Sequence, residues 1–191
     1  MKTEVIENWI QEAYGIAKAH GFHDQERGDN VLLMLIVTEI SEAVEADRKN
    51  KHPRELRIFK NACADHSGKP EWENFGFSRC FGERIKDTLE DELANIVIRC
   101  CDFLGCHGRT FQQSYRKPFE PLNRSHYTFA DEAWYWVWML VQQSHSAPTN
   151  VAGLLLTVCD YCEANNIDIV SHVEWKMKYN RTRPKLHGKA Y

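Results

Sequence analysis

The sequence has 191 residues, enough for one domain of ordinary size with its own core. Its 24 Lys and Arg against 27 Asp and Glu give a formal net charge of -3, which argues against a protein that coats nucleic acid. Hydrophobic residues make up 43% of the chain, so a disordered protein is excluded. No apolar run approaches the ~18 residues of a membrane span, and the N-terminal residues do not look like an export signal. We therefore expect a cytoplasmic protein that binds neither membranes nor nucleic acid polymers.

Helical periodicity runs through almost the whole sequence, without convincing strand alternation. The expected helices lie, in chain order, at about 3–19, 30–48, 82–104, 129–143, 149–164 and 169–180. Residues 50–81 hold prolines and glycines and no sustained period, so we expect an inserted loop there with one short helix near 56–63. The helix pair around 129–164 lies within a second insertion at about 107–165. We expect an all-α helical bundle of about six helices in a single domain, 1–191.

The cysteines are expected to be reduced thiols. Their number, seven, is odd, and no export signal places the chain in an oxidising compartment. Cys159 and Cys162 lie in an apolar stretch with helical periodicity. We therefore expect these two thiols to be buried on a helix rather than bound to a metal.

Carboxylates on the expected helix at 30–48 occupy unusual positions. At about 100° per residue, Glu39 falls near the middle of the apolar face and Glu42 at its edge, whereas Glu45 lies further toward the polar side. An unpaired carboxylate that faces a core costs several kcal/mol, on the order of the desolvation penalty of an ion. Glu39 therefore needs a cation or a proton.

The expected helix at 82–104 has a matching polar flank. Glu92, Asn95, Arg99 and Asp102 follow one another at helical spacing beside its apolar face. If the two helices pack antiparallel, Glu92 and Asn95 come close to the two glutamates of the preceding helix. Such a group of oxygen ligands suits a hard divalent cation, most commonly Mg2+. Two alternatives stay open, namely a solvated acidic face and a buried salt bridge between a glutamate and Arg99.

Three segments carry a family resemblance. The first is LMLIVTEISEAVEADRKN, with Glu39 and Glu42, and the second is IKDTLEDELANIVIRCCDFLG, with Glu92 followed by Asn95. The third is the C-terminal HVEWKMKYNRTRPKLHGKAY. In this order they resemble the MazG-like, all-α nucleoside triphosphate pyrophosphatase superfamily, and in particular its phage and bacterial dUTPase-like branch. The resemblance covers about 1–50, 82–105 and 167–191.

The resemblance implies Mg2+-dependent hydrolysis of a nucleoside triphosphate to the monophosphate and pyrophosphate, in house-cleaning or nucleotide pool control. It also implies a homodimer or homotetramer. The implied metal ligands are Glu39, Glu42, Glu92 and Asn95, and the implied catalytic residues are Glu39, Glu42 and Glu45, with Glu42 or Glu45 accepting a proton from water. The implied substrate contacts are Lys176, Asn180, Arg181, Arg183 and Asp102.

The sequence departs from the family pattern at one ligand position. Asn95 stands where the family has an aspartate, so the site loses one anionic ligand and should bind a cation more weakly. Two alternatives follow, a nucleotide-binding relative with weakened catalysis and a helical interaction protein whose acids pair with Arg and Lys. No residue selects a base, and deoxyuridine, deoxycytidine and damaged triphosphates are all compatible with the pattern.

A tryptophan-rich segment lies in the second insertion. Trp134 and Trp138 stand four residues apart on one helix face, so we expect them to pack into the interior or a subunit interface. Trp136 falls on another face and is expected to be available to a partner chain. Stacking of this cluster on a nucleobase is the alternative.

Overall fold

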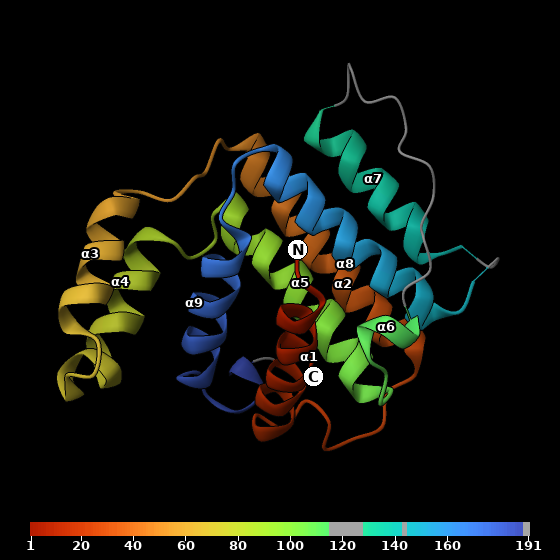
Figure 1. The fold of residues 1–191 in the computed structure, drawn as a ribbon, viewed down its shortest axis with the longest axis horizontal. Coiled ribbons are helices and arrows are strands. Elements are labelled where there is room, and N and C mark those ends of the chain that lie inside the picture. The colour runs from red at the N-terminus through yellow and green to blue at the C-terminus, as the bar shows by residue number, and fades with distance from the viewer. Residues whose placement is uncertain (115–127, 143–144, 189–191) are drawn as a thin grey trace.

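The computed structural model describes residues 1–114, 128–142 and 145–188, and within these ranges the chain is helical with no β-strand (Figure 1). The α-helices are α1 (Thr3–Ala19), α2 (Asp29–Arg48), α3 (Leu56–His66), α4 (Phe77–Arg84), α5 (Leu89–Cys106), α6 (Phe111–Ser114), α7 (Phe129–Leu140), α8 (Ala147–Ala164) and α9 (Ile169–Arg181). A π-helical turn, η1 (Trp72–Gly76), precedes α4, and a short turn, η2 (Lys185–Gly188), follows α9. The all-α prediction is confirmed. Among the described residues, no helix is both long and apolar enough to cross a membrane.

Helix α5 forms the centre of the bundle. It packs against α1, α2, α8 and α9, and Figure 1 shows these helices around it. Its apolar stripe, which includes Leu93, Ile96 and Leu104, is fully buried. The helix begins where the Thr88 side chain accepts a hydrogen bond from the backbone N–H of Asp91 at 3.3 Å. This central position brings every side chain on the polar flank of α5 against another helix.

The predicted start of this helix is wrong. Residue 82 belongs to α4, and α5 begins at Leu89, after a turn in which Asp87 has a φ of 60°. Asparagine and aspartate tolerate this left-handed conformation better than most other residues, so the turn separates two helices that periodicity alone joins. The same turn aims Lys86 and Asp87 at the cavity described below.

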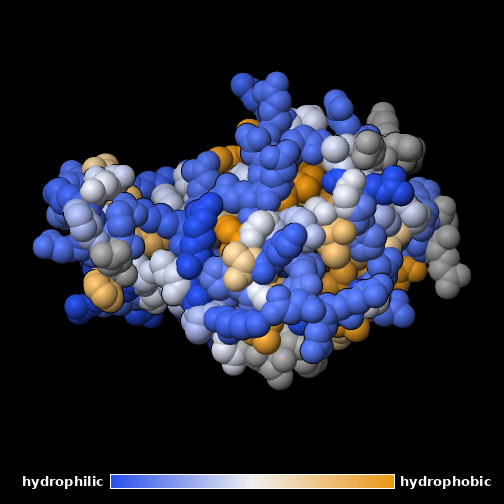
Figure 2. Space-filling model, turned by 90° about the horizontal axis from the view of Figure 1, so that it is seen from below, coloured by the Kyte–Doolittle hydropathy of each residue, from blue (hydrophilic) through white to orange (hydrophobic). Residues whose placement is uncertain are grey.

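The short helix expected near 56–63 is present as α3, but the rest of the loop expected at 50–81 is wrong, because η1 and most of α4 lie there. Together α3, η1 and α4 form an arm (Figure 1). The arm has its own aromatic core, in which Phe59, Phe77, Phe81 and Trp72 are buried. Phe77 and Phe81 lie on one face of α4, with Ile85 just after its end, and α4 packs against α3 and α9. The arm projects from the bundle in Figure 1, and again in Figure 2, where hydrophilic residues cover most of the visible face.

The helix pair expected around 129–164 is present as α7 and α8, and α7 ends at Leu140. Parts of the second insertion, 115–127 and 143–144, lie outside the described residues. Trp136, expected to be available to a partner chain, is instead fully buried against Phe129 and Tyr161. Trp134 is 72% exposed and Trp138 is 41% exposed, so neither packs into the interior of this chain, and their expected place in a subunit interface stays a prediction. The face of α7 that packs on α2 and α8 is therefore the one that carries Trp136. In α8, Cys159 and Cys162 are buried as expected.

Candidate functional site

A cavity of about 230 Å³ lies along the polar flank of α5, where α1, α2 and α9 meet it. Helix α1 contributes small and aliphatic side chains, α2 contributes two glutamates, and α9 contributes Lys176 and Asn180. The turn before α5 adds Lys86, and the segment after α9 adds Arg183. The cavity therefore has an apolar wall, an acidic wall and cations from the turn before α5, from α9 and from the segment after α9.

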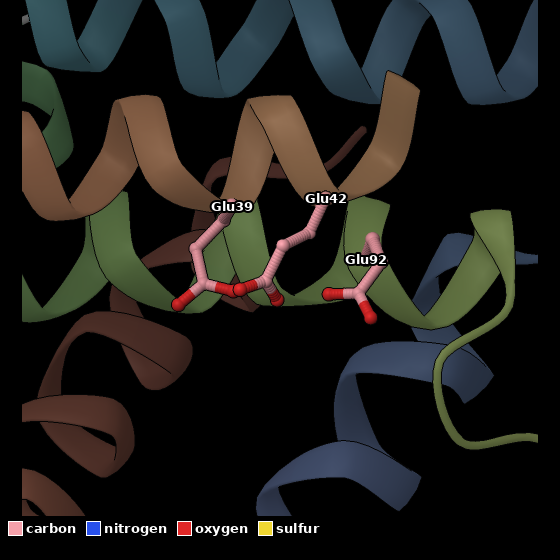
Figure 3. Close-up of side chains that lie close together, drawn as sticks. All are labelled: Glu39, Glu42 and Glu92. Carbon is pink, nitrogen blue, oxygen red and sulfur yellow. The ribbon is translucent and has the colours of Figure 1, made fainter. Parts of the chain in front are cut away.

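Three carboxylates meet in this cavity, Glu39 and Glu42 from α2 and Glu92 from α5. One oxygen of each lies within 4.8 Å of the oxygens of the other two. Figure 3 shows the three side chains reaching into the same space from two helices. Glu39 and Glu92 are buried, and Glu42 is exposed. This spacing is compatible with a single divalent cation bound between the three residues.

The salt bridge considered as an alternative is present beside the carboxylates. Arg99 Nε donates a hydrogen bond to Glu39 Oε1 at 3.1 Å, and both side chains are largely buried. The guanidinium carbon of Arg99 lies 5.4 Å from the centre of the Phe22 ring. Arg99 thus balances the charge of Glu39.

Glu92 has a perturbed pKa. Burial raises its pKa to about 7, and the negative charges of Asp91 and Glu39 act in the same direction. The Lys176 ammonium and a hydrogen bond from Asn95 Nδ2 to Glu92 Oε2, at 2.7 Å, oppose the rise. Asn95 therefore supports Glu92 in this structure, as a donor to one of its carboxylate oxygens.

Asp91, the residue before Glu92, has a different environment that sequence reasoning missed. It is fully buried, and its Oδ2 accepts hydrogen bonds from Lys176 Nζ at 2.7 Å and from the Asp87 backbone N–H at 2.9 Å. Burial raises the pKa of Asp91, and the Lys176 charge opposes that change. Lys176, expected as a substrate contact, is thus held in the cavity by a buried ion pair. The N-cap Thr88 three residues before Asp91 is the sequence signal that places this acid in the first turn of a helix.

Two other cations line the cavity, and sequence reasoning had identified one of them. Arg183 was expected there, and its Nη2 donates to the His187 carbonyl oxygen at 3.2 Å. Lys86 was not expected, since the predicted helix at 82–104 gave it no special position. Its Nζ lies 2.7 Å from Asp87 Oδ1, within the left-handed turn.

Two expected site residues lie away from the cavity. Glu45 is exposed and pairs with Arg48 at 3.1 Å and with Lys49 at 3.0 Å, both on the outer face of α2 or just beyond its end. Arg181 pairs with Glu12 of α1, on the outside of the bundle. Neither Glu45 nor Arg181 lines the cavity.

The remaining expected residues, Asn180 and Asp102, do line the cavity. Asn180 is buried, and no described group makes a hydrogen bond to its Oδ1. Asp102 lies at the end of the cavity near the C-terminus of α5, where its Oδ1 accepts a hydrogen bond from His23 Nε2 at 2.7 Å. His23 lies in the segment after α1, and its side chain is only 13% exposed.

Comparison with known proteins gives no assignment, since no family model, no curated protein and no solved structure matches this chain. The residues of the cavity are therefore the basis for any functional assignment.

Proposed function

We propose that this protein is a Mg2+-dependent nucleoside triphosphate pyrophosphohydrolase that converts a nucleoside triphosphate and water into the monophosphate and pyrophosphate. One observation carries the proposal: three carboxylates converge from α2 and α5 in a cavity that also receives Lys86, Lys176 and Arg183. An acidic group beside several cations suits a metal-bound polyphosphate, whose charges need partners of both kinds. The resemblance of the acidic motifs to the MazG-like superfamily supports the same reaction.

The acidic group fits a bound Mg2+. The carboxylates of Glu39, Glu42 and Glu92 offer oxygen ligands within 4.8 Å of one another. Mg2+ in proteins is held by few carboxylates, and waters and substrate phosphates complete its shell. When bound, the ion would neutralise phosphate oxygens and make a bound water more acidic.

Proton transfer is assigned to Glu42. It is the exposed member of the acidic group and lines the cavity, so a water molecule can reach it. In the proposed reaction the water oxygen attacks the α-phosphorus and its proton passes to the Glu42 carboxylate. The bond from the α-phosphorus to the bridging oxygen breaks, and pyrophosphate leaves with that electron pair. The distant Glu45 takes no part, because it pairs with Arg48 and Lys49 outside the cavity.

Lys86 and Arg183 are assigned to the phosphates of the leaving group. Both line the cavity, and both come from segments that flank helices rather than from helix centres. Lys176 has a positioning role as well, because its ammonium is already held by Asp91. Cations fixed before substrate arrives stabilise the charge that develops on departing pyrophosphate at little reorganisation cost.

The test is pyrophosphate release from a panel of nucleoside and deoxynucleoside triphosphates, with and without Mg2+. We expect release only with Mg2+, and we expect Glu42→Gln to slow it by about 10²–10⁴-fold, the usual contribution of a general base. The matched control is Glu45→Gln, on the same helix but outside the cavity, which should keep wild-type activity.

Two outcomes would contradict the proposal. Tight triphosphate binding without pyrophosphate release would indicate a relative that binds nucleotides but has weak or no catalysis, as the Asn95 substitution allows. Absence of both Mg2+ and nucleotide binding in a folded protein would favour the interaction protein, with the acids serving only as partners for cations such as Arg99.

A further inference from the structure

Tyr179 of α9 lies beside two of the cations that line the cavity. It is half-buried and does not line the cavity itself. The Lys176 ammonium lies 5.9 Å from the centre of the Tyr179 ring, and the Arg183 guanidinium carbon lies 6.0 Å from it. A positive charge at this distance over an aromatic ring is attracted by the electrons of the ring face. One aromatic side chain therefore contacts two cations of the cavity.

The spacing of the three residues accounts for these contacts. Lys176 and Tyr179 stand three residues apart on α9, and Arg183 follows four residues later. Residues at these spacings are neighbours on the surface of a helix. Although α9 ends at Arg181, the Arg183 backbone N–H donates a hydrogen bond to the Asn180 carbonyl oxygen at 3.2 Å, so the chain continues to turn. Arg183 is thereby kept close to the Tyr179 ring.

The arm supports the Tyr179 ring. The ring of Phe81, in α4, stacks on Tyr179 with 4.7 Å between ring centres and 22° between ring planes. Phe81 is fully buried in the aromatic core of the arm, and its own ring centre lies 5.7 Å from the Lys176 ammonium. The hydroxyl of Ser78, also in α4, lies 2.9 Å from the hydroxyl of Thr182, just after α9. The arm is thus joined to the part of α9 from which these two cations come.

The ring complements the hydrogen bonds that the two cations already make. Lys176 donates to Asp91 at 2.7 Å, and Arg183 donates to the His187 carbonyl oxygen at 3.2 Å. A long side chain keeps much of its rotamer freedom around a single hydrogen bond, and that freedom is lost when an anion binds. A ring packed beside each side chain reduces this freedom in advance, so that binding of phosphates costs less entropy.

We propose that Tyr179 is a positioning residue for the phosphate-binding cations, and that the arm acts on the cavity through the stacked rings of Phe81 and Tyr179. This inference rests on the proposed function and adds to it a role for the arm. Tyr179 acts through Lys176 and Arg183 rather than by contact with the substrate, because it does not line the cavity. The ring, and not the hydroxyl group, is the part of Tyr179 that does this.

The test measures binding of imidodiphosphate, a pyrophosphate analogue that is not hydrolysed, by calorimetry in the presence of Mg2+. This probe carries the charges of the leaving group and no base, so its affinity depends on the cations and the metal site. We expect Tyr179→Leu to bind it about 10-fold more weakly than wild type, the size of one cation–ring contact. Tyr179→Phe keeps the ring and should bind it within about 2-fold of wild type.

Tyr161→Leu is the matched control. Tyr161 of α8 is also half-buried, and its ring contacts the buried rings of Phe129 and Trp136, away from the cavity. This variant should lose stability but keep the wild-type affinity for imidodiphosphate. If Tyr179→Leu does not fold, Tyr179→Met, with an unbranched side chain and no ring, takes its place.

The outcomes separate this inference from the proposed function. Wild-type affinity in a folded variant without the ring would overturn the inference and leave the proposed function standing. An equal loss of affinity in Tyr179→Phe or in Tyr161→Leu would do the same, because the ring of Tyr179 would then not be the cause. Failure of the wild-type protein to bind imidodiphosphate with Mg2+ would overturn the proposed function as well.

Discussion

Asp91 and Glu92 are consecutive buried acids on α5, but the charged groups around them differ. Asp91 is paired with Lys176 at 2.7 Å and receives a backbone hydrogen bond from Asp87. Glu92 faces Glu39 and Glu42 and has an amide, Asn95, as its described hydrogen-bond partner. The first acid has its countercharge within the chain, and the second shares a space with two more acids.

The difference indicates a structural role for Asp91, and we propose a functional role for Glu92. In a buried ion pair the two charges neutralise each other, and this pair links α5 to α9. A buried acid among other acids is unfavourable unless a cation or a proton arrives, and perturbed groups of this kind gather at functional sites. Removal of a charge at or beside each acid should therefore change the stability of the protein in different ways.

The largest effect is expected at the ion pair. Lys176→Met leaves Asp91 buried without its countercharge, and we expect the free energy of unfolding to fall by about 3–5 kcal/mol. Chemical denaturation monitored by circular dichroism measures it. Lys51→Met, which removes an exposed lysine 3.7 Å from Asp87, should cost less than about 1 kcal/mol. Similar losses in the two variants would show that Asp91 does not depend on Lys176.

At Glu92 we expect removal of the charge to stabilise the Mg2+-free protein rather than to destabilise it. Its pKa of about 7 means that the folded protein keeps a proton that the unfolded chain, with a value of 4.5, releases. The free energy of unfolding of the Mg2+-free protein therefore falls as pH rises from 4.5 to 7, by at most about 3 kcal/mol. Glu92→Gln should remove this fall and be the more stable protein at pH 8 without Mg2+.

With Mg2+ present, wild type should become more stable than Glu92→Gln. Bound at the acidic group, the ion stabilises wild type and not Glu92→Gln, because ligand binding to the folded state adds to stability. The test measures denaturation curves of wild type and Glu92→Gln at pH 5 and pH 8, with and without Mg2+. A Glu92→Gln variant less stable than wild type in Mg2+-free buffer at pH 8 would mean that Glu92 is a structural acid like Asp91.

The smallest effect is expected at Asn95. Asn95→Asp replaces the donor to Glu92 by a fourth acid, so without Mg2+ the protein should lose about 1 kcal/mol of stability. With Mg2+ the variant should bind the ion more tightly than wild type, since affinity rises with the number of charged ligands. Calorimetric Mg2+ titration of the two proteins measures this. Weaker binding by the variant would show that residue 95 lies outside the ligand set.

Sequence patterns predicted the parts of the molecule that depend on local periodicity. The position of Glu39 on the apolar face of its helix predicted a buried carboxylate, and Glu39 is 6% exposed. The same wheel placed Glu45 toward the polar side, and its catalytic role came only from the family resemblance. The structure puts Glu45 on the outer face of α2. Position on the helix was the better guide for both residues.

The remaining features depend on contacts between distant segments. Asp91 and Lys176 are 85 residues apart, and His23 and Asp102 are 79 apart, so no local pattern connects either pair. Of the arm's helices, α3 was expected, but α4 was missed because the Pro and Gly residues before it obscured the aromatic spacing of Phe77 and Phe81. Trp136 was assigned to the wrong face because α7 is apolar on several sides, and only its neighbours decide which side is buried.

The central claim is that Glu39, Glu42 and Glu92 form a cation site, and a Mg2+ titration by calorimetry at pH 8 tests it most directly. We predict saturable binding for wild type and Glu45→Gln, and loss of that binding in Glu92→Gln. Absence of Mg2+ binding in wild type, or equal binding in Glu92→Gln, would contradict the claim. The acidic group would then be a set of crowded carboxylates with Arg99 as its described countercharge.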